Sequence, residues 1–200
     1  MSEIWLSIDL SSSSGSVCLH SREAGLRLLG EVALPDGGRH SESVLGAVQA
    51  ALAQSGVTLA QVNRLITSSG PGSFTGLRVA HASLKAFYAA LQIPVEFVDG
   101  HEARAWAFAK ETGANEFAVT TRLTRDQILA SDYRVQNGVP VLEKEEIVAA
   151  PPAGTRVDEE FPLLARHLAE CLETAQSRQT AATPEAIAAA SPRYYGSRFS

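Results

Sequence analysis

Cysteine, methionine, aromatic residues and long apolar runs are all scarce in this 200-residue chain. It contains two cysteines, one methionine and 6% aromatic residues. Cys18 and Cys171 lie far apart and form no C-x-x-C pair, which argues against a disulfide or metal framework and indicates reduced, buried thiols. No stretch reaches the roughly 20 apolar residues that a membrane span requires, and the start MSEIWLSIDL lacks a signal-peptide pattern. We therefore expect a cytoplasmic protein with no membrane association.

An excess of basic residues is also missing. The 17 Lys and Arg against 22 Asp and Glu leave a formal net charge of −5. The surface as a whole therefore does not attract phosphate backbones, and nothing predicts strong direct binding of nucleic acid. What is present is an ordinary globular composition, 45% hydrophobic and 20% charged, which is sufficient for a buried core.

Hydrophobic periodicity predicts an α/β fold. Alternating apolar residues at the start of the chain are typical of three strands in an antiparallel meander. The pattern then becomes helical, with apolar residues at i, i+4 and i+7, and strands alternate with helices from residue 64 onward. Such alternation is typical of a parallel sheet. The predicted elements of this half are strands over 4–8, 16–20, 26–34, 64–67 and 93–98, and helices over 41–54, 74–91 and 100–110.

The pattern changes after about residue 112. Strands are predicted over 116–121 and 127–135, and Asn137-Gly138 is typical of a hairpin turn. A helix over 161–174 and a short helix over 184–190 complete the prediction. We therefore divide the chain into an N-terminal lobe, 1–110, and a small second lobe with a C-terminal tail, 111–200.

A glycine-rich turn, SGPGSFTGLR (Ser69–Arg78), joins the strand over 64–67 to the next helix. Gly70, Gly72 and Gly76 have the spacing G-x-G-x-x-x-G. A phosphate-binding P-loop requires a lysine that is missing here, and the dinucleotide motif requires its third glycine one residue earlier. Two interpretations remain: a tight turn that packs the helix on the sheet, or a helix N-terminus that binds an anion beside Ser73.

A second polar turn follows the first strand, where Asp9 precedes four serines, Ser11–Ser14, and a glycine. This arrangement is similar to the first phosphate loop of actin-like ATPases, in which an acidic residue approaches a metal and hydroxyl groups hold phosphate. A serine-rich β-turn is the alternative. The candidate residues of a degenerate phosphate or anion site are Asp9, Ser11, Gly70, Gly72 and Ser73.

No catalytic or metal-binding residue is assigned from the sequence. The five histidines are scattered, and no H-x-x-x-H pair suits zinc. The G-x-S-x-x-G around Ser73 is one residue too long for the nucleophile elbow of a hydrolase. A nucleophile, a base and an orienting group within reach of one another are not indicated.

Several of these segments together resemble one family. The start IDLSSSSGSVCL, the HSE that opens the first helix, the stretch SGPGSFTGLRVAHASLKAFYAALQIPV and the ending PRYYGSRF look like TsaB, a bacterial family needed for the threonylcarbamoyladenosine modification of tRNA. The resemblance is specific from about Ile4 to His101. In the second half, Thr120-Thr121-Arg122 stands where the family usually carries an Asp-Ala-Arg-like motif. The missing acidic residue argues against a nucleotide site between the lobes.

The resemblance implies the ASKHA fold, which is the actin-like ATPase and ribonuclease H-like fold, with a reduced second lobe. It also implies a non-catalytic partner of TsaD, the subunit that transfers the threonylcarbamoyl group, with the ATPase TsaE joining the pair. No intrinsic cofactor is expected, although ATP or ADP would fit at the junction of the complex. Contact with tRNA is expected only through the complex.

The interface with TsaD is expected on the first two long helices, where small and apolar side chains permit close helix approach. The same face would support a homodimer when TsaD is absent. The alternative is that these positions are only core. The predicted interface residues are Val44, Leu45, Val48, Leu52, Val79, Ala82, Ala86 and Ala90.

Two other functions stay open at this stage. A stand-alone actin-like ATPase or kinase would use Asp9 and the two polar turns to hold ATP. A metallopeptidase-like activity follows from a historical glycoprotease label of the family, but neither a zinc pair nor a serine triad supports it.

Overall fold

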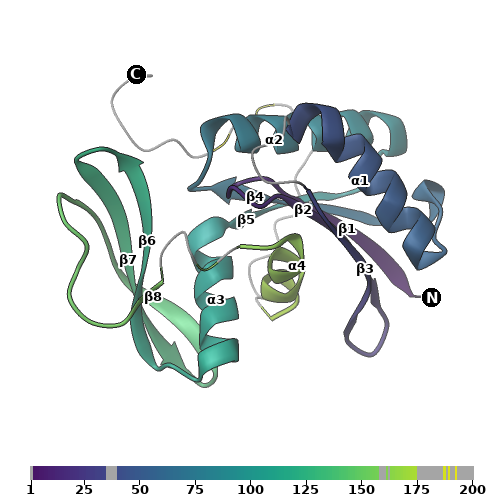
Figure 1. Cartoon of the computed structure of the whole chain (residues 1–200). Helices are drawn as coiled ribbons and strands as arrows, with labels where there is room; N and C mark the ends of the chain where they lie inside the picture. Colours follow the sequence, from purple (N-terminus) through teal and green to yellow (C-terminus); the bar gives the residue numbers. More distant parts are fainter. Residues whose placement is uncertain are drawn as a thin grey trace.

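Two β-sheets of different size organise the molecule (Figure 1). The computed structural model describes residues 2–34, 40–157, 161, 163–174, 187, 189 and 192. The larger sheet has the order β3-β2-β1-β4-β5, in which β1, β2 and β3 are antiparallel neighbours and β4 and β5 run parallel to β1. Its strands are β1 (Glu3–Asp9), β2 (Ser16–Arg22), β3 (Leu26–Ala33), β4 (Arg64–Gly70) and β5 (Val95–Asp99).

Helices cover both faces of the five-stranded sheet. In Figure 1, α1 (His40–Ser55) and α2 (Phe74–Leu91) lie on one face, and α3 (Gly100–Thr112) and α4 (Ala165–Thr174) lie on the other. Because side chains alternate along a strand, β1 serves both layers. Leu6 and Ile8 belong to the core cluster beneath α1 and α2, whereas Trp5 packs with Leu168 of α4.

The smaller sheet has the order β8-β7-β6-β9. It comprises β6 (Glu116–Thr124), β7 (Gln127–Gln136), β8 (Val139–Val148) and β9 (Arg156–Val157). Asn137 and Gly138, with φ of 52° and 79°, form the turn between β7 and β8 and confirm the predicted hairpin. Phe117 and Tyr133 of this sheet form a third core cluster with Ala105 of α3, so α3 joins the two sheets.

Helix α2 begins and ends where periodicity predicts, and α1 and α3 agree with prediction to within two residues. Helix α4 begins at Ala165, later than predicted. It packs on the larger sheet, although its residues belong to the predicted second lobe, 111–200. Strand β9 and the short 3-10 helix over Leu59–Gln61 were not predicted, and β8 was implied only by the predicted hairpin turn. Of the predicted helix over 184–190 only residues 187 and 189 are described, and the ending PRYYGSRF lies outside the described residues.

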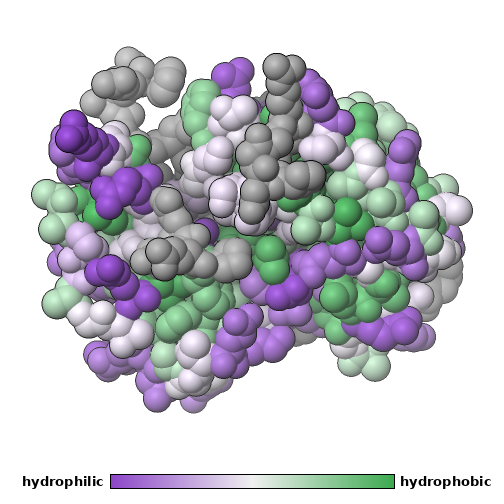
Figure 2. Space-filling view, in the orientation of Figure 1, coloured by the Kyte–Doolittle hydropathy of each residue, from purple (hydrophilic) through white to green (hydrophobic). Residues whose placement is uncertain are grey.

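From the composition we also expected buried thiols without a disulfide and no membrane-spanning segment. Cys18 and Cys171 are buried and neither forms a disulfide, as predicted. Within the described part of the chain, no helix combines the length and the apolar character needed to cross a membrane. Figure 2 shows hydrophilic and hydrophobic residues interspersed over the face seen in Figure 1.

Candidate functional site

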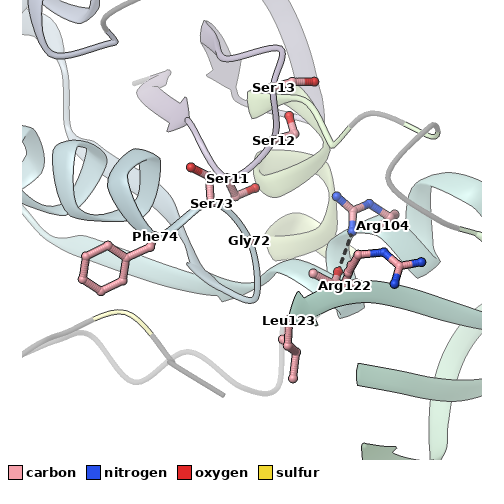
Figure 3. Close-up of a pocket in the computed structure, with 10 residues that line it drawn as sticks. Ser11, Ser12, Ser13, Gly72, Ser73, Phe74, Arg104, Arg122 and Leu123 are labelled. Atoms are coloured by element: carbon pink, nitrogen blue, oxygen red, sulfur yellow. Dashed lines mark hydrogen bonds between the residues drawn. The ribbon is translucent and has the colours of Figure 1, made fainter. Parts of the chain in front are cut away.

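A pocket of about 400 Å³ lies where the two sheets approach one another (Figure 3). Three segments of the larger unit meet β6 of the smaller one there: the β1–β2 turn, the β4–α2 turn and α3. The residues that line the pocket are Ser11, Ser12, Ser13, Gly72, Ser73, Phe74, Arg104, Thr121, Arg122 and Leu123. The pocket thus brings together the two polar turns that the sequence singled out.

The glycines of the β4–α2 turn allow this turn to approach the β1–β2 turn closely. The Ser73 N–H donates to the Ser11 carbonyl oxygen at 2.7 Å. A Cβ on Gly72 would lie 2.4 Å from the same oxygen, and a Cβ on Gly76 would lie 1.8 Å from the Leu10 carbonyl oxygen. Only glycine fits at either position without moving backbone. The glycine spacing is therefore explained by packing of α2 on the sheet.

The backbone amides at positions 70, 73, 76 and 77 of this turn donate to groups within the protein. Ser73 is the N-cap of α2, and its Oγ accepts from the Gly76 N–H at 3.2 Å. The Gly70 N–H donates to Ser68 Oγ at 3.0 Å, and Gly70 is buried and does not line the pocket. Of the predicted anion-site residues, Ser11, Gly72 and Ser73 therefore line one pocket and Gly70 does not.

Asp9 lies beneath the serine turn and does not line the pocket. Its carboxylate accepts from the Ser11 N–H at 3.3 Å on Oδ1 and from the Ser11 hydroxyl at 3.1 Å on Oδ2. Burial raises the pKa of Asp9 to about 6, although the Ser11 hydrogen bonds and Arg104 act in the opposite direction. Both oxygens thus stabilise the turn rather than face a ligand.

The charged groups that line the pocket are arginines. Arg104 of α3 is 3% exposed, and its Nη1 donates to Thr121 Oγ1 at 3.4 Å. Arg122 of β6 is exposed, and its Nη1 donates to the Arg125 carbonyl oxygen at 3.3 Å. Figure 3 shows these arginines on one side of the pocket and the serines with Gly72 on the other, while Phe74 points away from them. The described lining residues include no carboxylate, and the charge of Arg104 acts on the nearby buried carboxylate of Asp9.

A hydrogen-bond chain that is buried except at Glu145 lies on the arginine side of the pocket, and sequence reasoning missed it. His101 Nδ1 lies 2.7 Å from Ser131 Oγ, and His101 Nε2 lies 2.8 Å from Thr121 Oγ1. The Ser131 hydroxyl donates to Glu145 Oε2 at 3.1 Å. Ser131 has one proton to donate, so a neutral His101 donates from Nδ1 and accepts the Thr121 hydroxyl proton at Nε2. Thr121 Oγ1 is then left as an acceptor for Arg104.

This chain runs through α3, β6, β7 and β8, which are far apart in the sequence. His101 lies two residues after Asp99, whose side chain caps α3 by accepting from the His101 and Glu102 amides. The only sequence signal was a histidine in the first turn of a helix after a buried strand. Its hydroxyl partners on two strands become visible only when the smaller sheet packs against α3.

Within the described residues, no group of three His, Cys, Asp or Glu side chains is placed to hold a metal ion. Two other histidines, His20 and His81, are buried and do not line the pocket. His81 Nε2 lies 3.0 Å from the Ser68 carbonyl oxygen, and burial lowers the pKa of His81. Burial, reinforced by the charge of Arg166, lowers the pKa of His20 to about 4.

The predicted interface residues on α1 and α2 fall into three groups. Val44 and Val48 are 2% and 3% exposed and lie in the core beneath α1, so their prediction as interface residues is wrong. The reason is that the apolar face of α1 covers the sheet. Leu52 and Val79 are half-buried against the same core. The exposed members are Leu45, Ala82, Ala86 and Ala90.

Comparison with known proteins gives a family and a fold. The sequence model of the family described as TsaD, tRNA N6-adenosine threonylcarbamoyltransferase, matches residues 36–145. An uncharacterized protein of Mycobacterium tuberculosis is 42% identical over 74 residues, 37% of this chain and 35% of that protein. The tRNA threonylcarbamoyladenosine biosynthesis protein TsaB of Escherichia coli is 27% identical over 113 residues, 56% of this chain and 49% of that protein.

The chain is thus aligned with about a third to a half of the length of these relatives. The solved structure of YeaZ from Pseudomonas aeruginosa superposes with a TM-score of 0.72 at 24% identity, covering 88% of this chain and 93% of that one. This likeness confirms the predicted ASKHA-type α/β fold. Because the family model matches more than half of the residues, the chain belongs to the TsaD family, and within that family it is a TsaB-like protein.

Proposed function

We propose that this chain is a non-catalytic partner of TsaD in the transfer of threonylcarbamoyl to adenosine in tRNA. The observation that carries the proposal is the family match over residues 36–145, which spans every element from α1 to β7 and most of β8. The name of the Escherichia coli relative refers to the same modification. The proposed setting is the cytoplasm, with TsaE joining the pair and tRNA contacted through the complex.

The proposed TsaD interface is the solvent-facing side of α1 and α2. Leu45 is 56% exposed on α1, and Phe74 is 39% exposed at the start of α2, beneath the guanidinium of Arg78 at 5.3 Å from the ring centroid. The exposed alanines at positions 82, 86 and 90 recur every four residues along α2, on one face of the helix. Small side chains in such a row permit close approach of a partner helix.

The non-catalytic part of the proposal is supported by the environment of Asp9. An actin-like ATPase would need this carboxylate to face a metal-bound phosphate, whereas here both of its oxygens accept from Ser11. We therefore propose no intrinsic cofactor, and we place ATP or ADP only at the junction with TsaD. A stand-alone ATPase is the rival, and micromolar ATP binding with turnover by the isolated chain would favour it.

The proposal is tested by the mass of the complex. Size-exclusion chromatography with light scattering compares the chain alone, with TsaD of the same organism, and with TsaD, TsaE and ATP. The expected result is a complex with TsaD at micromolar concentration. If the two proteins elute separately under all three conditions, the partner proposal is wrong. The run without TsaD also shows whether the chain forms a homodimer.

The variant Leu45→Asp tests the proposed surface. A carboxylate at this exposed position would be desolvated against the partner, so we expect the affinity for TsaD to fall at least about tenfold. Leu142→Asp is the matched control, because Leu142 is 48% exposed on β8 and lies outside the proposed surface. Equal loss in both variants would place the interface elsewhere. Val79→Asp is unsuitable, since Val79 packs against the core and its substitution should destabilise the fold.

A further inference from the structure

We propose that α4 is an acid-sensitive helix, which is docked on the larger sheet at neutral pH and is released on acidification before the rest of the fold opens. The inference is independent of the partner role, because it rests on the groups that α4 buries. Figure 1 shows α4 against the face of the larger sheet opposite to α1 and α2. Two histidines are buried at this contact, His167 on the helix and His20 on β2.

The face of β2 that carries His20 is the face that α4 covers. Ser16 Oγ accepts from the Ala165 N–H at 2.8 Å, so the side chain of Ser16 points toward the start of α4. Side chains alternate along a strand, which places His20 on the same face as Ser16. Val17 and Leu19, on the opposite face, belong to the core beneath α1 and α2. His20 therefore lies on the α4 side of the sheet.

His167 is uncharged in the docked helix, because its ring accepts a hydrogen bond. The Leu164 N–H donates to His167 Nδ1 at 3.3 Å, and the His167 N–H donates to the Leu164 carbonyl oxygen at 2.9 Å. Leu164 directly precedes α4, so His167 takes the place of the Glu or Gln in a capping box, whose side chain bonds back to the residue before the helix. A proton on Nδ1 would remove this acceptor, and the cation would oppose the positive end of the helix dipole.

The charges around His167 disfavour a protonated ring. Glu111 of α3 is a carboxylate that faces the ring, at 3.8 Å from Nε2, but it is exposed to solvent. Burial, reinforced by three cations, lowers the pKa of His167 to about 4. These cations are Arg166 of α4 and Lys110 and Arg104 of α3.

His20 also lacks a group that would balance a charge on its ring. Its Nδ1 lies 3.7 Å from Cys18 Sγ, and within the described part of the chain its Nε2 has no hydrogen-bond partner. Burial, reinforced by the charge of Arg166, lowers the pKa of His20 to about 4. The carboxylates that act on neighbouring Cys18 already pair with cations, Glu31 with Arg166 at 2.6 Å and Glu170 with Lys110 at 3.0 Å.

The other contacts of α4 allow it to leave the sheet by itself. Its apolar side chains pack with Trp5, Ile66 and Ala103, in a cluster separate from the core beneath α1 and α2. The ion pairs at its flanks are partly exposed and contribute little. The helix is therefore a local unit that can open at a lower free energy than the whole fold.

Acid favours the released helix, because both rings bind protons more strongly when they are exposed. The ordinary histidine pKa is about 6.5, against about 4 for each ring in the docked state. Between pH 7 and pH 5 each histidine should therefore raise the opening constant of α4 about twentyfold, and the two together on the order of several hundredfold. Carboxylates with ordinary pKa values stay charged at pH 5, so their ion pairs do not cause the change.

Hydrogen exchange of the full-length chain, followed by mass spectrometry at pH 7, 6 and 5, tests the proposal. Rates are corrected for the intrinsic pH dependence of exchange. At pH 5 we expect the opening constant of the peptide over 165–174 to exceed that of peptides from β1 and β4 at least about tenfold. Equal protection of α4 and β1 at every pH would mean that they open together, and it would overturn the proposal. An opening constant of α4 that does not change with pH would do the same.

The variant His167→Gln separates titration from capping. Glutamine keeps a capping-box acceptor but binds no proton, so the rise in the opening constant between pH 7 and pH 5 should be about twentyfold smaller than in the unaltered chain. His20→Gln should reduce the rise to a similar extent. If both variants fold and keep the full pH dependence of α4, the histidines do not cause the release and the proposal is wrong.

His81→Gln is the matched control. His81 is also buried, but it lies on α2, and its Nε2 contacts the Ser68 carbonyl oxygen. This variant should leave the pH dependence of α4 unchanged. A reduction equal to that in His167→Gln would show a general effect of buried histidines and contradict the assignment to the α4 contact.

Discussion

At the residue scale, Gly76 shows how tightly α2 packs against the end of β1. The Leu10 carbonyl oxygen occupies the space in which a side chain at position 76 would begin. Gly46, in contrast, lies on the exposed side of α1 and has nothing within 4 Å of an added Cβ. The two helical glycines therefore differ in what they do for the fold.

Alanine substitution at these two positions should have opposite effects. Gly76→Ala should lower the free energy of unfolding by about 2 kcal/mol or more, because backbone must move to relieve the overlap. Gly46→Ala should raise it by about 0.5–1 kcal/mol through helix propensity. Urea denaturation measures both. A neutral Gly76→Ala would show that the approach of α2 to β1 is looser than described.

His101 illustrates a residue whose role no local pattern reveals. Its position near the N-terminus of α3 was visible in the sequence, but its partners Thr121 and Ser131 come from strands 20 and 30 residues away. A lone histidine carries no spacing signal, so the sequence offered no reason to prefer it over the other four.

At the element scale, α4 links the C-terminal part of the described chain to the first sheet. Its buried side chains pack with Trp5, Ile66 and Ala103. Ion pairs flank the helix: Arg166 with Glu31 at 2.6 Å, Arg22 with Glu173 at 2.5 Å and Lys110 with Glu170 at 3.0 Å. The main stabilisation comes from apolar burial, since partly exposed ion pairs contribute little.

Truncation of a buried side chain tests this account of α4. Leu168 is fully buried, so Leu168→Ala should lower the free energy of unfolding by about 2–5 kcal/mol. Leu142→Ala is the control, since Leu142 is 48% exposed on β8 and its loss should cost less than about 0.5 kcal/mol. Equal costs in chemical denaturation would contradict the packing of α4 on the sheet.

Helices α1 and α2 show what hydrophobic periodicity alone can and cannot predict about a helix. Their bounds were predicted well because apolar residues recur with a helical period. The periodicity did not separate the residues of α1 that face the sheet from those that face solvent. Val44 and Val48 lie in the core and Leu45 is exposed, although all three were predicted as interface residues. All three alanines predicted as interface residues on α2 are exposed.

At the scale of the whole molecule, buried titratable groups couple folding to pH. Burial, with the charge of Arg166, lowers the pKa of His20 and of His167 to about 4. Between the ordinary histidine pKa of about 6.5 and this value, the unfolded chain binds protons that the folded protein does not. Asp9 acts in the opposite direction, because its pKa is raised to about 6 and the folded protein binds the extra proton.

The combined effect of His20 and His167 exceeds that of Asp9, so these three groups together should lower the free energy of unfolding as the solution is acidified. We expect a net loss of about 3 kcal/mol in the free energy of unfolding between about pH 7 and pH 4.5. The Asp9→Asn variant lacks the proton uptake by Asp9 that opposes the histidines. Its free energy of unfolding should therefore fall by about 2 kcal/mol more than that of the unaltered protein over the same pH range. Urea denaturation at several pH values measures both proteins. Parallel pH profiles would show that the pKa of Asp9 is not raised by folding.

The sequence by itself determined the α/β class, the main helices and strands, the hairpin turn at Asn137-Gly138 and the resemblance to TsaB, because these depend on local periodicity and short motifs. Only the tertiary structure decided that Ser11 and Ser73 meet Arg104 in one pocket while Asp9 turns inward. It also assigned the glycines of the turn to close packing. These outcomes depend on side chains from separate elements competing for the same space and the same hydrogen bonds, and no spacing along the chain records that competition.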